Sequence, residues 1–218
     1  MSATTAVREV AAAAAEAGAG LRVVSDAAIS SALRAAANRL RGAHGPVLAA
    51  NAADVETAQA AGMSTGLLDR LRLDPARLDT AARALDDVAA LTPEPSLTFL
   101  RNLPGGEAVY ERRLPVGVVA ATYEARPAVT LDVASQVLRA RSAAVLRTGR
   151  AALQTSALLV DQVLVPALVE VGLPAAAVGA TVGQATVLRL RRQEEYVRRE
   201  FFQMHSLPRP DDPPPIAP

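Results

Sequence analysis

Three short apolar runs separated by helical patterns constrain the fold of this chain more than any other feature. Residues 116–122, 143–147 and 178–182 are apolar runs too short for a helix, which is typical of strands in a sheet interior. The first is expected to be buried on both faces. Residues 128–140 and 151–171 between them read as helices, the second a single long amphipathic one. Strand, helix, strand, helix, strand with short connections predicts a parallel sheet with right-handed crossovers.

The part of the chain before residue 96 carries only helical patterns. The expected helices are 6–17, 26–41, a third from Pro46 to about residue 61, 67–71, and one opened by Asp74-Pro75. Gly18 and Gly20 are expected to end the first helix, and Ser25 to cap the second. After Pro95, residues 96–101 and 107–113 flank a Leu-Pro-Gly-Gly turn and predict a β-hairpin.

These patterns predict an α/β protein in which a helical N-terminal segment packs on an incomplete Rossmann-like parallel sheet. The expected division of the chain is a helical segment at 1–95, a partial Rossmann-like cofactor-binding domain at 96–183, a charged amphipathic helix at 184–205 and a Pro-rich disordered tail at 206–218.

Composition removes several classes of chemistry. The sequence has no cysteine, and all 23 basic residues are arginine, so thiolate chemistry and lysine Schiff bases are excluded within the chain. The two histidines, His44 and His205, lie far apart, so no metal site is expected. A net charge of +1 gives no general attraction to nucleic acid or to an anionic membrane. Arginines interrupt each apolar run, so no membrane-spanning segment is expected and a cytoplasmic location is predicted.

The most specific stretch follows the hairpin. It reads Leu-Pro-Val-Gly-Val-Val from Leu114, then Tyr-Glu-Ala-Arg-Pro from Tyr123, then Val-Thr-Leu-Asp from Val129. This stretch resembles the first βα unit of the γ-glutamyl phosphate reductases, or glutamate-5-semialdehyde dehydrogenases, of the aldehyde dehydrogenase superfamily. The resemblance covers about residues 25–183. It implies that the parallel sheet is of the aldehyde dehydrogenase type.

The resemblance also implies a reaction, the NADPH-dependent reduction of γ-glutamyl phosphate to glutamate-5-semialdehyde in proline biosynthesis. A cysteine thiolate from a later catalytic domain attacks the acyl phosphate in this chemistry. We therefore expect this oxidoreductase-like chain to be truncated before the catalytic cysteine, to bind NADP(H) weakly, and to be inactive alone. The expected partner is a separately encoded catalytic half or a related subunit. No catalytic residue is assigned within the chain.

Five positions carry the expected site through the resemblance. The cofactor-binding residues are Tyr123, Glu124, Arg147 and Gly149, and the substrate-binding residue is Arg126. Two alternatives stay open: Arg126 anchors a loop through Glu124, and Arg147 is a strand-end arginine that faces solvent.

One departure from the family pattern bears on the backbone. Arg141 stands where the family has a glycine, and a positive φ at that position would strain the connection.

A second function from a different class is a non-catalytic pseudoenzyme. It would retain the fold and bind a protein partner through the divergent tail, residues 184–218.

Overall fold

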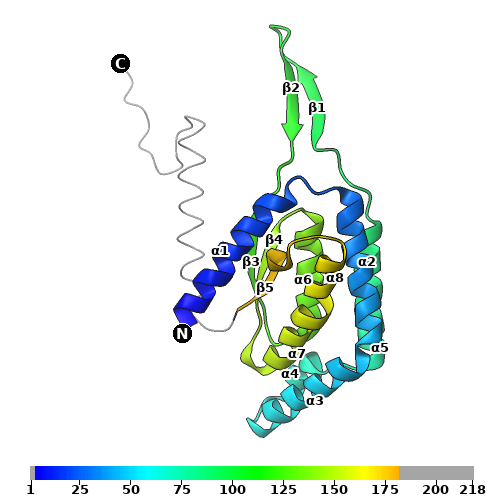
Figure 1. The fold of residues 1–218 in the computed structure, drawn as a ribbon, viewed down its shortest axis with the longest axis vertical. Helices are drawn as coiled ribbons and strands as arrows, with labels where there is room; N and C mark the ends of the chain where they lie inside the picture. Colours follow the sequence, from blue (N-terminus) through cyan, green and yellow to red (C-terminus); the bar gives the residue numbers. More distant parts are fainter. Residues whose placement is uncertain (1–2, 182–218) are drawn as a thin grey trace.

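The computed structural model of this protein describes residues 3–181 (Figure 1). The predicted charged helix at 184–205 and the predicted Pro-rich tail at 206–218 lie outside the described residues.

Five helices, a hairpin and a three-stranded sheet with its crossover helices follow one another along the chain. The elements are α1 (Ala3–Leu21), α2 (Asp26–Gly42), α3 (His44–Ala60), α4 (Thr65–Leu71), α5 (Pro75–Ala90), β1 (Leu97–Asn102), β2 (Ala108–Arg112), β3 (Val118–Thr122), α6 (Pro127–Arg139), β4 (Ala143–Arg147), α7 (Leu153–Leu158), α8 (Val165–Glu170) and β5 (Val178–Ala180). The predicted succession of helices, hairpin and parallel sheet is therefore confirmed.

The sheet has the order β3-β4-β5 and is parallel throughout. Its central strand β4 is buried, as its apolar sequence predicts. The expectation that the first strand is buried on both faces is wrong, because β3 is an edge strand and is only half-buried. An edge strand has a neighbour on one side alone, so its side chains keep contact with solvent.

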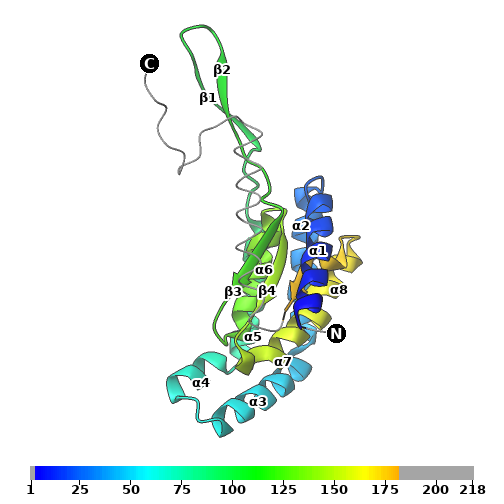
Figure 2. The same ribbon diagram turned by 90° about the vertical axis from the view of Figure 1, so that its left-hand side faces the viewer.

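The molecule is layered around this sheet (Figures 1 and 2). Helix α1 covers one face, and α6 and the α7–α8 stretch cover the other, with α2 and α5 packed outside them. Helices α3 and α4 lie at the end of the molecule where α7 begins. One hydrophobic core includes residues of the helical segment and of the sheet, among them Leu33, Leu85 and Val145. The division at residue 95 stays a prediction.

The prediction that Gly18 and Gly20 end the first helix is wrong, since α1 continues to Leu21. These glycines serve tertiary packing. A Cβ on Gly18 would collide with the carbonyl oxygen of Gly117, in the segment that leads into β3. The absent side chain therefore lets α1 lie directly against the backbone at the start of the sheet.

The predicted single helix at 151–171 is interrupted. A 3-10 turn at Arg150–Ala152 precedes α7, and a π-helical turn at Leu159–Leu164 separates α7 from α8. Pro166 lies just after this turn and has no N–H to donate to the helix, which accounts for the altered hydrogen-bond register.

The same stretch corrects the expectation that no apolar segment reaches membrane-spanning length. Arg150–Glu170 is 21 residues long and, by length and composition, apolar enough to cross a membrane. Half of its apolar window is buried inside the protein, and Leu159, Val163 and Leu164 are fully covered in the core. The stretch therefore packs as the core helix of this fold.

The two predicted helix caps and the predicted backbone strain are present. Ser25 Oγ accepts a hydrogen bond from Ala28 N at 3.2 Å, and an Asp74 carboxylate oxygen accepts one from Arg77 N at 2.7 Å. Arg141 has a φ of 53°, and is the one non-glycine residue with positive φ in the described chain.

The β1–β2 hairpin projects from the body at the end opposite to α3 and α4 (Figures 1 and 2). Its strands pair antiparallel, and Phe99 and Tyr110 stack edge to face with ring centres 5.6 Å apart. Side chains on both faces of the hairpin are exposed.

Candidate functional site

The carboxyl ends of β3 and β4 meet at one edge of the sheet, where open parallel sheets bind ligands. Tyr123 N donates to the carbonyl oxygen of Arg147 at 3.1 Å, which continues the strand pairing by one residue beyond β3. Thr148 Oγ1 lies 3.4 Å from the carbonyl oxygen of Glu124 and donates to it. The structure thus brings predicted residues from two separate parts of the sequence together.

Gly149 lies where the two loops at this edge pass each other. A Cβ on Gly149 would lie 3.0 Å from Ala125 N and 3.2 Å from Ala125 Cβ. These distances leave little room for any side chain. The glycine therefore lets the loop after β4 pass close to the loop after β3.

A cavity of about 180 Å³ lies beside this edge, between α6 and α7. Its polar lining is made mostly of hydroxyl groups, together with the carboxylate of Asp161; the hydroxyl groups come from Tyr123, Thr130, Thr148, Ser156 and Thr181. The Tyr123 hydroxyl lies 2.8 Å from Thr130 Oγ1, which donates to Ser156 Oγ at 3.2 Å. Thr181 Oγ1 is buried and has no hydrogen-bond partner within residues 3–181. This cavity therefore offers one unused hydroxyl beside a connected chain of three.

Burial raises the pKa of Tyr123 above its usual value of 10.0, and the hydrogen bond with Thr130 opposes that shift. The phenol is therefore uncharged at neutral pH. It presents a neutral hydroxyl to whatever occupies the cavity.

A second hollow, a groove of about 420 Å³, lies between α5 and the first turns of α6. The charged residues that line it are Arg70, Arg72, Asp74, Arg77, Arg126 and Asp132. The loop after β3 thus sends Tyr123 to the cavity and Arg126 to the groove. This placement is compatible with both roles considered for Arg126. The residue lines a groove in which a substrate can bind, and its Nε lies 3.4 Å from Glu124 Oε2, as expected if it anchors the loop.

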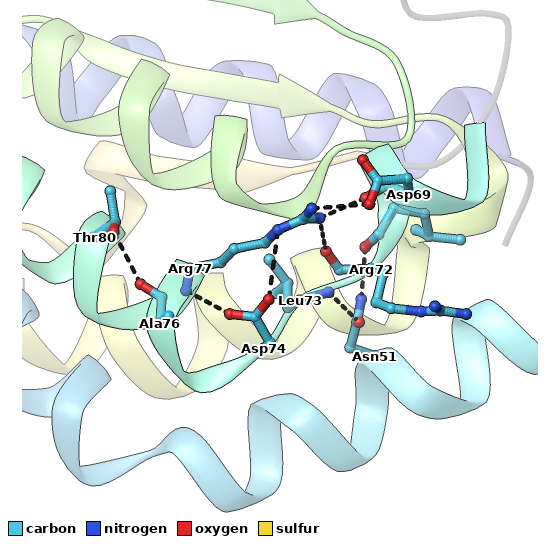
Figure 3. Close-up of polar contacts among 9 residues, drawn as sticks. Asn51, Asp69, Arg72, Leu73, Asp74, Ala76, Arg77 and Thr80 are labelled. Carbon is cyan, nitrogen blue, oxygen red and sulfur yellow. Dashed lines mark hydrogen bonds and ion pairs between the residues drawn. The ribbon is translucent and has the colours of Figure 1, made fainter. Parts of the chain in front are cut away.

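The connection between α4 and α5 is fixed by two side chains (Figure 3). Arg77 Nη1 donates to the carbonyl oxygens of Asp69 at 2.5 Å and Arg72 at 2.7 Å, and Nη2 donates to Asp69 Oδ1 at 2.9 Å. On the other side, buried Asn51 accepts from Leu73 N at 2.7 Å. These bonds hold the end of α4 against α3 and the start of α5.

Asp54 fixes the start of α7 from α3. It is buried, and its Oδ2 accepts from Thr155 N at 2.8 Å and from Thr155 Oγ1 at 2.7 Å, while Oδ1 accepts from Gln154 N at 3.4 Å. A carboxylate at a helix N-terminus satisfies free N–H groups and is favoured by the helix dipole. Asp54 thereby anchors the loop that carries Gly149.

Of the residues that line these two hollows, only Tyr123 and Arg126 were predicted as site residues. Thr130 is part of the Val-Thr-Leu-Asp stretch and so had a sequence signal without an assigned role, and Arg70 lies in the predicted helix at 67–71. Ser156 and Thr181 carry no local signal, because only the packing of α7 and β5 brings them to the cavity.

A pH-dependent effect is expected at Asp132, whose pKa burial raises from its usual value of 3.8. The folded state then holds its proton to higher pH than the unfolded state, so the contribution of Asp132 to stability falls as pH rises through this interval. The Asp132→Asn variant lacks this loss. Denaturant unfolding at several pH values should therefore show that the stability of the variant, relative to that of the parent chain, increases from below pH 3.8 to pH 7. A constant difference would contradict the placement of Asp132.

Comparison with known proteins identifies the relatives of this fold. A γ-glutamyl phosphate reductase of Leifsonia xyli subsp. xyli is 46% identical over 159 residues, which cover 72% of this chain and 38% of the relative. The crystal structure of a γ-glutamyl phosphate reductase from Thermotoga maritima matches with a TM-score of 0.74 and 28% identity, over 80% of this chain and 42% of that one. This chain is homologous to the front part of the γ-glutamyl phosphate reductases. A scan against protein-family models gives no match.

The wider fold is that of the aldehyde dehydrogenases. A structure of a probable aldehyde dehydrogenase from Listeria monocytogenes matches with a TM-score of 0.62 at 16% identity, over 82% of this chain and 37% of that one. The expected aldehyde dehydrogenase type of sheet is confirmed. The chain spans well under half the length of these γ-glutamyl phosphate reductases.

Proposed function

We propose that this chain supplies the nicotinamide-cofactor-binding part of a γ-glutamyl phosphate reductase and that the cofactor is NADP(H). The observation that carries the proposal is the meeting of Tyr123 and Arg147, joined through their backbones at the carboxyl edge of the sheet, in a chain that is 46% identical over 159 residues to a γ-glutamyl phosphate reductase. This edge is where open α/β sheets take dinucleotides.

The residues present fit a polar part of such a cofactor. The cavity is smaller than the roughly 300–1,000 Å³ of a usual ligand pocket, so it would take one portion of a dinucleotide. The unpartnered hydroxyl of Thr181 and the neutral phenol of Tyr123 would hydrogen-bond that portion. Arg147, at the end of β4, would face the adenosine ribose, where an arginine can bind the 2′-phosphate of NADP(H). Gly149 would keep the adjoining loop close to it. Glu124 stays a predicted cofactor residue, although its carboxylate faces two arginines.

The reaction of the whole enzyme would be the reduction of γ-glutamyl phosphate to glutamate-5-semialdehyde in proline biosynthesis. A thiolate would displace phosphate from the acyl group to give a thioester, and NADPH held at this edge would supply the hydride that turns the thioester into the aldehyde and releases the thiolate. The 218 residues hold no cysteine, so the thiol would come from outside them, and we propose a catalytic half or related subunit as its source. Arg126 would bind the carboxylate or phosphate of the substrate.

A comparison of the affinities for NADPH and NADH tests the choice of NADP(H). Nucleotide fluorescence, titrated with the full chain at fixed ionic strength, should show NADPH binding at least tenfold tighter than NADH. Equal affinities would show that the 2′-phosphate is not recognised. No binding of either nucleotide would overturn the proposed function as a whole.

A further inference from the structure

Two arginines from different elements share one carboxylate oxygen at the rim of the groove. Arg70, on α4, places Nη1 3.3 Å from Glu124 Oε2, and Arg126, just before α6, places Nε 3.4 Å from the same oxygen. The Arg70 contact is a hydrogen bond. The Arg126 contact is an ion pair only, because its buried Nε makes no hydrogen bond to the described residues. The two guanidinium groups therefore have further N–H donors that can bind a larger anion.

The charges that line the groove favour an anion. Four arginines and two aspartates line it, so the lining is net positive. Arg77 and Asp74 are already bound to each other and to backbone groups, which leaves Arg70, Arg72 and Arg126 to attract an anion. Asp132, the other carboxylate, has its pKa raised by burial, so burial disfavours its charged form.

The groove also contains the start of α6, a 13-residue helix. Arg126 is the residue at its N-cap position, and its side chain makes no capping hydrogen bond. Pro127, the first residue of the helix, has no N–H, and Val129 N donates to the carbonyl oxygen of Arg126 at 3.1 Å, so this end contributes mainly the positive potential of the helix dipole. This end of the helix supports an anion site that the two arginines create.

Glu124 holds the arginines only weakly. The side chains of Arg70, Arg126 and Glu124 are 51%, 42% and 63% exposed, so a ligand from solvent reaches all three. Exposed ion pairs of this kind are weak, because water screens the charges and competes for them. An incoming carboxylate or phosphate therefore displaces Glu124 at a small cost in free energy.

We propose that Arg70 and Arg126 form a two-arginine site for a carboxylate or phosphate group of the substrate, and that Glu124 occupies this site until the substrate displaces it. The inference rests on the proposed function and adds to it a second substrate-binding residue, Arg70, and an internal competitor, Glu124. A purely structural ion pair makes the opposite prediction for Glu124, because its removal would then gain nothing for a ligand.

The test is titration of the full chain with inorganic phosphate and, separately, with L-glutamate, by calorimetry at low ionic strength. Arg70→Ala should weaken binding of the effective probe at least tenfold, and Glu124→Gln should strengthen it at least threefold. Arg83→Ala, which removes an exposed arginine of α5 outside the groove lining, should stay within twofold of the parent chain. Thermal unfolding of each variant checks that it is folded.

Phosphate binding alone would assign the site to the phosphate end of the substrate, and glutamate binding would assign it to a carboxylate. The proposal is overturned if neither probe binds, if Arg70→Ala behaves as Arg83→Ala does, or if Glu124→Gln binds no more tightly than the parent chain. The parent chain is titrated with NADPH in parallel. Anion binding with this pattern but without NADPH binding would leave the arginine site standing and refute the cofactor proposal.

Discussion

Replacement of Asp54 by alanine should lower the free energy of unfolding by about 3 kcal/mol, because it strips partners from buried donors. Asp54 is 4% exposed and accepts from Gln154 N, Thr155 N and Thr155 Oγ1. Only Thr155 Oγ1 keeps a second contact, with Asn51 Nδ2 at 3.3 Å. For a chain of this size the loss corresponds to a fall of about 10 °C in Tm. Denaturant unfolding followed by circular dichroism measures it.

Glu56→Ala is the matched control for this prediction. Glu56 is on the same helix and is exposed, so its loss removes one carboxylate without uncovering a buried donor. It should change the free energy of unfolding by no more than about 0.5 kcal/mol. Equal effects of the two variants would contradict the role of Asp54 as the anchor of α7.

Gly18→Ala should destabilise the protein by about 2 kcal/mol, although alanine is the better helix former. The new Cβ would meet the carbonyl oxygen and carbon of Gly117, which are backbone atoms that cannot rotate aside. Helix α1 must then move off the sheet. Chemical denaturation measures the loss, and hydrogen exchange should show reduced protection in β4, the strand that α1 contacts most, and in β3, which follows Gly117 directly.

Gly20 supplies the comparison within the same helix. A Cβ there would meet only Pro174 Cγ at 3.9 Å, an ordinary van der Waals contact. Gly20→Ala should therefore raise the free energy of unfolding by about 0.5–1 kcal/mol through helix propensity. Destabilisation by both variants to the same extent would show that α1 does not pack on Gly117 as described.

The sequence predicted the sheet well because its strands carry their own signal. The run at 143–147 is apolar up to its final arginine, and β4 occupies those same residues in the buried centre of the sheet. Local sequence patterns gave wrong helix boundaries where tertiary contacts determine the structure. Gly18 and Gly20 read as a helix stop, yet α1 continues through them. The π-helical turn before Pro166 has no periodicity that distinguishes it from an α-helix.

The sequence predicts the part of the candidate site that depends only on the topology of the sheet. A parallel sheet places the ends of adjacent strands side by side, so the meeting of Tyr123 and Arg147 follows from the pattern. The pair between Arg70 and Glu124 joins residues 54 positions apart. Its geometry depends on how the α4–α5 connection is held by Arg77 and Asn51, which no local pattern reveals.

The proposed function requires the carboxyl edge of this sheet to bind a nicotinamide dinucleotide phosphate. Calorimetric titration of the full chain with NADPH, beside the Arg147→Ala variant, tests this binding. The parent chain is expected to bind with a dissociation constant in the micromolar range, and the variant at least tenfold more weakly, because it loses the cation at the end of β4. Absence of binding at millimolar NADPH, or equal affinity of the two chains, would contradict it.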